Sequence, residues 1–208
     1  MNIALIVNSK AGGGKAKKFG TSIARELSKS GLHYTEIREG SVVETLQSFS
    51  RIHEKDPFTT IISVGGDGLA HSLFPLAIEH SIPIFVAPAG TGNDFARSTG
   101  SFGLKATKIV QHVRETKPKS IDVGQIECMG EIFLFGQVLS TGFDSLVNER
   151  ANGYRHLSGK LKYIIAVARE LPFFVPKSYR VTLDGYSYET GAMLVAVAIG
   201  KSYGGGMK

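Results

Sequence analysis

An aspartate inside a glycine-rich loop is the first feature of the sequence that could carry chemistry. Residues 60–64 are mostly β-branched, as in a buried strand. The loop that follows contains Gly65, Gly66, Asp67 and Gly68. Because glycine lets the backbone approach a ligand closely, this loop can face phosphates. Asp67 could then accept a hydrogen bond from a hydroxyl or take part in a magnesium network. The alternative is an ordinary turn in which Asp67 caps a helix.

A second loop of the same kind supports a phosphate site. Residues 82–87 form another apolar segment, and residues 88–97 follow it with the sequence PAGTGNDFAR. Thr91 offers a hydroxyl, Gly92 a backbone N–H group and Asn93 an amide to a nucleotide. Open α/β sheets bind ligands at the carboxyl ends of their strands, so two such loops predict a phosphate cradle.

A third loop follows the first apolar segment of the chain, residues 3–7. It is neither a P-loop nor a Gly-x-Gly-x-x-Gly dinucleotide motif. We expect its backbone N–H groups, with Lys10 or Lys15, to contact nucleotide phosphates. The alternative is a flexible basic turn. The residues of this loop that we assign to the nucleotide are Asn8, Ser9, Lys10, Ala11 and Gly12.

The two glycine loops together resemble the diacylglycerol kinase catalytic domain family, which includes bacterial lipid kinases and sphingosine kinases. The string GTGNDFAR is specific to that family, whereas GGDG also occurs in NAD kinases. Further matches are residues 8–13, 122–123, 141–144 and 203–206. The resemblance implies an enzyme that uses ATP with Mg²⁺. It implies transfer of the γ-phosphoryl group to a hydroxyl of diacylglycerol or a related membrane lipid.

The resemblance also implies roles for individual residues. Asp67 matches the family's essential aspartate, and Asp94 and Asp122 are further candidate catalytic carboxylates. Asp94 could equally cap a helix, and Asp122 could be an ordinary strand-end residue. No carboxylate has a spacing that identifies a metal ligand. Leu69 stands where the family usually has Thr, and His71 is either a polar contact or a helix-surface residue. The residues of these two loops that we assign to the nucleotide are Gly65, Gly66, Asp67, Gly68, Leu69, His71, Thr91, Gly92 and Asn93.

The pattern of apolar segments predicts two domains. Strands alternate with helices up to residue 118, which predicts a parallel α/β nucleotide-binding domain over residues 1–119. A β-rich domain is predicted over residues 120–208, and the family implies a sandwich-like fold. Its predicted strands are residues 121–128, 131–139, 178–184 and 186–199. The apolar run 193–199 predicts a strand buried on both faces.

Members of the family continue beyond the segment that residues 203–206 resemble. We therefore expect the second domain to be truncated here. The general base for the lipid hydroxyl is expected in the part that follows. Residues 1–208 alone should then bind nucleotide but transfer phosphate poorly.

The composition is that of a globular protein, with 42% hydrophobic and 20% charged residues among 208. Cys128 is the single cysteine, which excludes a disulfide framework and fits a cytoplasmic protein. The N-terminus lacks the basic region and cleavage site of a signal peptide. The longest apolar run is too short to span a bilayer.

A basic segment indicates a possible partner surface. The net charge is +6, which suits polyphosphate or an anionic membrane, and no nucleic-acid partner is predicted. Between Arg150 and Arg180 one acidic residue accompanies seven basic ones, with Phe173 and Phe174 among them. We expect peripheral contact with anionic lipid at the inner membrane face. The alternative is a solvated helix face beside core phenylalanines. The basic residues are Arg150, Arg155, Lys160, Lys162, Arg169, Lys177 and Arg180.

Two rival functions stay open beside a lipid kinase. An NAD kinase-like phosphotransferase shares GGDG, but the GTGNDFAR loop argues against it. A non-catalytic nucleotide- or lipid-binding module is favoured by Leu69 in place of Thr and by Ser72 in place of an acidic residue. An assay of ATP turnover with lipid acceptors separates these classes.

Overall fold

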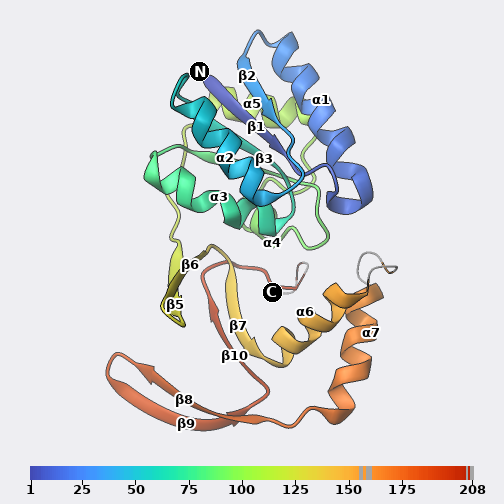
Figure 1. The fold of residues 1–208 in the computed structure, drawn as a ribbon, viewed down its shortest axis with the longest axis vertical. Helices are drawn as coiled ribbons and strands as arrows, with labels where there is room; N and C mark the ends of the chain where they lie inside the picture. The colour runs from blue at the N-terminus through green and yellow to red at the C-terminus, as the bar shows by residue number, and fades with distance from the viewer. Residues whose placement is uncertain (155–156, 158–160, 205, 207–208) are drawn as a thin grey trace. The chain divides into compact units, whose positions relative to one another are not determined.

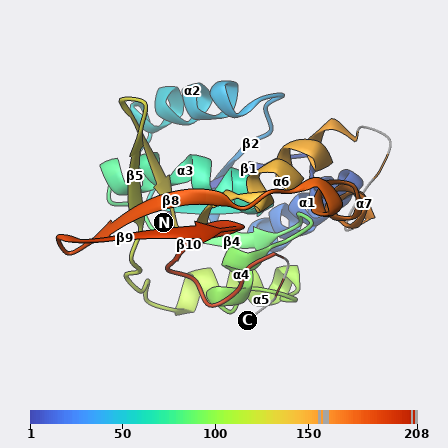
Figure 2. The same ribbon diagram turned by 90° about the horizontal axis from the view of Figure 1, so that it is seen from below.

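The computed structural model describes residues 1–154, 157, 161–204 and 206 (Figures 1 and 2). The chain divides into two compact units. Unit 1 comprises residues 1–137 and 199–208, and unit 2 comprises residues 138–198. Unit 2 is therefore inserted into unit 1 along the chain. The domain boundary between residues 119 and 120 that the sequence predicts stays a prediction.

Unit 1 is built around a four-stranded parallel sheet with the strand order β2-β1-β3-β4. The strands are β1 (Asn2–Val7), β2 (His33–Ile37), β3 (Thr60–Gly65) and β4 (Ile84–Pro88). The two central strands, β1 and β3, are buried at every residue. Burial on both faces explains why their sequences are largely apolar without alternation. The predicted parallel α/β domain is confirmed.

Helices cover both faces of this sheet (Figure 1). α1 and α5 pack on one face around Ile23 and Ile109. α2 and α3 pack on the other face around Phe49 and Leu73. Each helix therefore buries an apolar stripe against the strands, which fixes the loops at the strand ends. The bounds are α1 (Lys15–Lys29), α2 (Val42–His53), α3 (Asp67–Glu79) and α5 (Ala106–Glu115).

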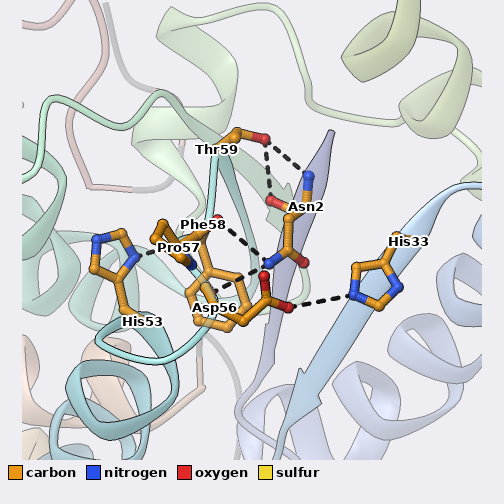
Figure 3. A network of polar contacts seen from close by, with 7 residues as sticks. All are labelled: Asn2, His33, His53, Asp56, Pro57, Phe58 and Thr59. Atoms are coloured by element: carbon orange, nitrogen blue, oxygen red, sulfur yellow. Dashed lines mark hydrogen bonds and ion pairs between the residues drawn. The ribbon is translucent and has the colours of Figure 1, made fainter.

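Polar contacts hold the amino ends of the strands together (Figure 3). The Asn2 N–H donates to Thr59 Oγ1 at 2.9 Å, and the Asn2 side chain donates to the Asp56 carbonyl at 3.3 Å. His53 Nδ1 accepts from the Phe58 N–H at 3.0 Å. The bonds of Asn2 tie β1 to the segment between α2 and β3, and the bond of His53 ties that segment to α2. The carboxyl ends of the same strands carry the loops described below.

The chain after α5 is rich in antiparallel strand pairs, which confirms the predicted β-rich part. β5 pairs with β6, β7 with β10 and β8 with β9. Two helices, α6 and α7, pack on each other in unit 2 around Val147 and Ala166. The strands are β5 (Gly124–Cys128), β6 (Glu131–Phe135), β7 (Val138–Gly142), β8 (Lys177–Leu183), β9 (Tyr186–Ala192) and β10 (Leu194–Ala198). The helices are α6 (Phe143–Gly153) and α7 (Leu161–Glu170), followed by the short helix η2 (Leu171–Phe173).

Two of the predicted strands are wrong as single elements. Residues 131–139 form parts of β6 and β7, because the chain changes its pairing partner at Gly136 and Gln137. Residues 186–199 likewise divide into β9 and β10 at Met193. The prediction that residues 193–199 are buried on both faces is also wrong. Leu194 is 39% exposed and Val197 is 53% exposed, so an apolar sequence alone overestimates burial here.

Candidate active site

Three loops meet at the carboxyl edge of the sheet in unit 1. β1, β3 and β4 are parallel neighbours, so the loops that follow them start at the same edge. The loop after β1 contains the short helix η1 (Ala11–Gly14). The loop after β3 leads through Gly66 into α3. The loop after β4 leads into α4 (Asp94–Ser98).

Glycines let these loops touch backbone to backbone. A Cβ atom on Gly90 would lie 2.5 Å from the Cα of Gly66. A Cβ on Gly12 would lie 2.2 Å from the Ala89 carbonyl oxygen, and Gly12 has a φ of +59°. No side chain fits at such distances, so glycine is required at these two positions. The glycines therefore assemble three separate loops into one cradle.

Asp67 links the second and third loops through its carboxylate. Its Oδ1 accepts from the Phe95 N–H at 3.0 Å, and its Oδ2 accepts from the Asp94 N–H at 3.2 Å. The side chain of Asp67 thus caps the first turn of α4, although Asp67 itself begins α3. Backbone N–H groups and the positive end of a helix favour an ionised carboxylate at this place.

The structure brings together two of the three predicted catalytic carboxylates. A Cβ on Gly92 would lie 3.2 Å from Asp67 Oδ2 and 3.3 Å from Asp94 Oδ2, so both carboxylates adjoin Gly92. Asp122 is exposed in the segment before β5. Among the described residues, no side-chain hydrogen bond or ion pair links Asp122 to these loops. Its catalytic role stays a prediction.

The first turn of α3 presents backbone donors to the cradle. Gly66 is the N-cap residue and provides no side-chain cap. The N–H groups of Asp67, Gly68 and Leu69 lie in the first turn of α3, where a backbone N–H group has no carbonyl partner within the helix. Such a helix start attracts anions. The Leu69 side chain is only 6% exposed and packs in the core with Leu73. Leu69 can therefore contact a nucleotide only through its backbone.

The side chain of Asn93 shapes the third loop. Its Oδ1 accepts from the Gly90 N–H at 2.8 Å, and its Nδ2 donates to the Gly90 carbonyl at 2.9 Å. The residue is buried and adopts a left-handed φ of +57°. Asparagine tolerates this conformation better than most residues. Thr91, at the tip of the loop, is exposed.

The first loop is closed by Asn8. Its Oδ1 accepts from the Lys10 N–H at 3.2 Å, and its own N–H donates to the Val64 carbonyl at 3.0 Å. This is an Asx turn that directs the chain away from β1. Lys10 is exposed, while Ser9 and Ala11 are half-buried. The ammonium group of Lys10 is therefore available to an anion, and the contacts of Ser9 and Ala11 with a nucleotide stay predictions.

His71 lies on α3, one turn after Asp67. Its Nε2 is buried and makes no hydrogen bond to any described residue, and its ring lies 5.2 Å from that of Phe74. Burial lowers the pKa of His71, while the neighbouring Asp67 carboxylate acts in the opposite direction. The imidazole is therefore neutral at pH 7, and it is not the exposed helix residue of one alternative.

We expect a specific pH dependence from His71. Because its pKa is lower in the folded than in the unfolded state, protonation favours unfolding. The stability held by the neutral form is present above the unfolded pKa of about 6.5 and is lost as pH falls below it. Thermal unfolding at about pH 7.5 and at about pH 5, which lie on either side of the ordinary histidine pKa of about 6.5, should show a smaller loss of Tm for His71→Gln than for the unmodified chain. An equal loss in both would contradict this role of burial.

The sequence did not indicate a structural role for three polar residues in or beside α4. Ser98, Gln137 and Ser202 form hydrogen bonds that connect α4 with residues 137 and 199–202. A polar Gln137 after Gly136, inside an otherwise apolar segment, is the signal that could have indicated a break in the strand.

Comparison with protein families agrees with this geometry. Residues 2–126 match the model of the diacylglycerol kinase catalytic domain. Residues 137–208 match the model of the YegS C-terminal NAD kinase beta sandwich-like domain. The first match contains all three loops of the cradle, and the second matches the predicted sandwich-like part.

Similar proteins and a similar solved structure are named diacylglycerol kinases. A diacylglycerol kinase of Mycobacterium tuberculosis is 33% identical over 99% of this chain and 67% of its own length. A diacylglycerol kinase of Bacillus subtilis is 29% identical over 71% of this chain and 48% of its own length. A crystal structure of a diacylglycerol kinase from Bacillus anthracis is similar with a TM-score of 0.65 and 26% identity, covering 99% of this chain and 66% of that one. This chain spans about two thirds of the length of the first and third. It belongs to the diacylglycerol kinase catalytic domain family and so to the lipid-kinase phosphotransferases.

Proposed function

We propose that the protein transfers the γ-phosphoryl group of ATP to a hydroxyl of diacylglycerol or a related membrane lipid. The observation that carries the proposal is the contact of three glycine loops around the carboxylates of Asp67 and Asp94. Phosphoryl transfer is catalysed mainly by positioning and by charge stabilisation. The cradle supplies backbone donors, the ammonium group of Lys10 and two carboxylates for these tasks. The triphosphate would lie across the start of α3 and the loop ending at Asn93.

The two carboxylates fit a magnesium ion held jointly with phosphates. Protein sites for Mg²⁺ often supply only one or two carboxylates, and the remaining ligands are waters and phosphate oxygens. Each oxygen of the Asp67 carboxylate accepts one hydrogen bond from a backbone N–H group. Each oxygen has a second lone pair that can bind a cation. Among the described residues no group of three ligating side chains is present, which agrees with a metal that arrives with its nucleotide. When bound, the ion would neutralise phosphate charge.

The choice of a lipid acceptor rests on the relatives. Those reported above are named diacylglycerol kinases, and the matched catalytic domain carries the same name. The likeness of residues 137–208 to an NAD kinase sandwich concerns the fold of that part. A nucleotide acceptor such as NAD is therefore the less favoured candidate.

The acceptor can be tested with the full-length gene product. ATP consumption would be measured with Mg²⁺ and, in separate reactions, diacylglycerol, a glycolipid, a long-chain base or NAD. We expect consumption to depend on one of the lipids. Dependence on NAD would contradict the proposed acceptor class, and ATP binding without consumption in any reaction would support a binding module instead.

We further propose that the protein works as a peripheral protein at the anionic inner face of the cytoplasmic membrane. Arg169 and Lys177 are exposed, and Phe173 is 84% exposed, so the alternative of a core residue is wrong for Phe173. Arg150 and Arg180 form ion pairs with glutamates and contribute less free positive charge. Two basic residues of the segment, Arg155 and Lys160, lie outside the described residues. No helix that the structure describes is long and apolar enough to cross a bilayer.

Charge reversal in this segment should weaken membrane binding. We expect the double variant Lys162→Glu and Lys177→Glu to sediment less with vesicles that contain anionic lipid. Binding of the unmodified protein should fall as salt rises, because surface charges are screened beyond about 10 Å at 0.1 M salt. Lys108→Glu, on the exposed face of α5, is the matched control. Equal binding to neutral and anionic vesicles would overturn the electrostatic proposal.

A further inference from the structure

The two covalent connections between the units meet at one point. The chain leaves unit 1 after Gln137 and returns to it at Ile199. The carbonyl oxygen of Gln137 accepts from the Ile199 N–H at 2.8 Å and from the Gly200 N–H at 3.1 Å. The outgoing and returning segments are therefore bonded to each other within unit 1.

This point is fixed to α4 through side chains. Gln137 is 6% exposed, and its Oε1 accepts from Ser98 Oγ at 2.9 Å. Ser98 Oγ in turn accepts from the Lys201 N–H at 3.3 Å. A Cβ on Gly200 would lie 2.0 Å from the Gln137 Oε1, so a glycine at 200 leaves room for the buried amide. One hydroxyl on α4 thus contacts both connections.

A second bond holds the returning segment at the start of α4. Ser202 is buried, and its Oγ donates to the Asp94 carbonyl at 3.1 Å. The N–H groups of Asp94 and Phe95 in the same helix donate hydrogen bonds to the Asp67 carboxylate. The same short helix is therefore bonded to the candidate active site and to residues 137 and 199–202.

α4 contains only five residues, Asp94–Ser98. A helix of this length is not stable alone, so tertiary contacts decide its position. A cation at the Asp67 carboxylate would compete with the N–H groups of α4 for its oxygens, and a phosphate would compete with the carboxylate for those N–H groups. A ligand can shift a conformation when it interacts differently with the alternatives. α4 is the element here whose contacts such a ligand would alter.

We propose that Ser98, Gln137 and Gly200 form an anchor through which α4 passes a change at the candidate active site to both connections between the units. We call these three residues the α4 anchor. The inference rests on the proposed function, because a nucleotide at the cradle is the ligand that would move α4. Ser98 and Gln137 are then positioning residues for phosphoryl transfer and do not contact the reacting atoms.

Hydrogen exchange measured by mass spectrometry tests the α4 anchor. Peptides spanning residues 65–70, 90–95 and 199–202 would be compared with and without ATP and Mg²⁺. We expect ATP to change exchange in all three peptides of the unmodified protein. In Ser98→Ala, ATP should still change the first two but not the third. Ser48→Ala is the matched control, because the Ser48 hydroxyl on α2 donates to the exposed Glu39 carboxylate, and it should behave as the unmodified protein does.

The outcomes separate this inference from the proposed function. If ATP changes no peptide of the unmodified protein, both the proposed function and the anchor are overturned. If ATP changes residues 65–70 and 90–95 but not 199–202, the anchor alone is overturned. The anchor is also overturned if Ser98→Ala responds at residues 199–202 as the unmodified protein does.

Kinetics of the full-length gene product provide a second test. We expect Ser98→Ala to lower kcat by roughly 10- to 100-fold, since small misplacements cost rate of this order, while KM for ATP changes little. Ser98→Thr keeps the hydroxyl and should restore kcat. Gly200→Ala should displace the Gln137 amide and reproduce the loss with Ser98 intact. Unchanged kcat in both Ser98→Ala and Gly200→Ala would overturn the anchor.

Discussion

Asp67→Ala should lower the rate of phosphoryl transfer by at least about 100-fold, the effect typical of removing one group that stabilises transition-state charge. The variant should also lower the free energy of unfolding by about 1–2 kcal/mol, because it removes the side chain that caps α4. The sheet of unit 1 should stay folded, since Asp67 lies outside the buried clusters. Steady-state transfer and urea unfolding measure the two effects.

Asp67→Asn separates catalysis from capping. The asparagine oxygen can still accept from one of the two N–H groups, but the side chain carries no negative charge. We expect it to recover part of the lost stability and none of the lost rate. If the rate recovered together with stability, Asp67 would act only as the cap of α4.

Gly90→Ala should weaken ATP binding by roughly 10- to 100-fold, because the added Cβ would lie 2.5 Å from the Gly66 Cα and must separate the two loops. Overpacking of this kind also costs about 1–3 kcal/mol in the free energy of unfolding. Titration calorimetry with ATP and Mg²⁺ measures the affinity directly.

Gly191→Ala on β9 is the matched control for Gly90→Ala. A Cβ on Gly191 would meet no atom within 4 Å, so neither affinity nor stability should change appreciably. Equal affinities in Gly90→Ala and Gly191→Ala would contradict the close contact of the loops as the basis of the site.

The parallel half of the fold was predictable because its signals are local. β1 and β3 are short apolar runs that end in glycine loops, and parallel strands place such loops at a common edge. The motif made Asp67 and Asp94 candidate catalytic carboxylates, but the contact of both with Gly92 is a finding of the structure. That the Asp67 carboxylate would cap a helix 27 residues further on depends on the pairing of β3 with β4, which no local pattern contains.

The strands of the β-rich part were harder to delimit because their breaks depend on tertiary partners. Nothing local at Met193 ends a strand, yet β9 pairs with β8 and β10 pairs with β7. The α4 anchor was likewise invisible in the sequence, since Ser98 and Gln137 are 39 residues apart and meet through a partly buried hydrogen bond. Buried polar pairs of this kind follow from the fold rather than from spacing.

Transfer of a labelled γ-phosphoryl group from ATP to diacylglycerol in vesicles is the most direct test of the proposed function. With the full-length gene product and Mg²⁺, we expect the label to appear in the lipid fraction. The same measurement on Asp67→Asn should show at least about 100-fold less labelled lipid per unit time, while Gly191→Ala should match the unmodified protein. Label that appears only as inorganic phosphate, or an equal rate of lipid labelling by Asp67→Asn, would contradict the proposal.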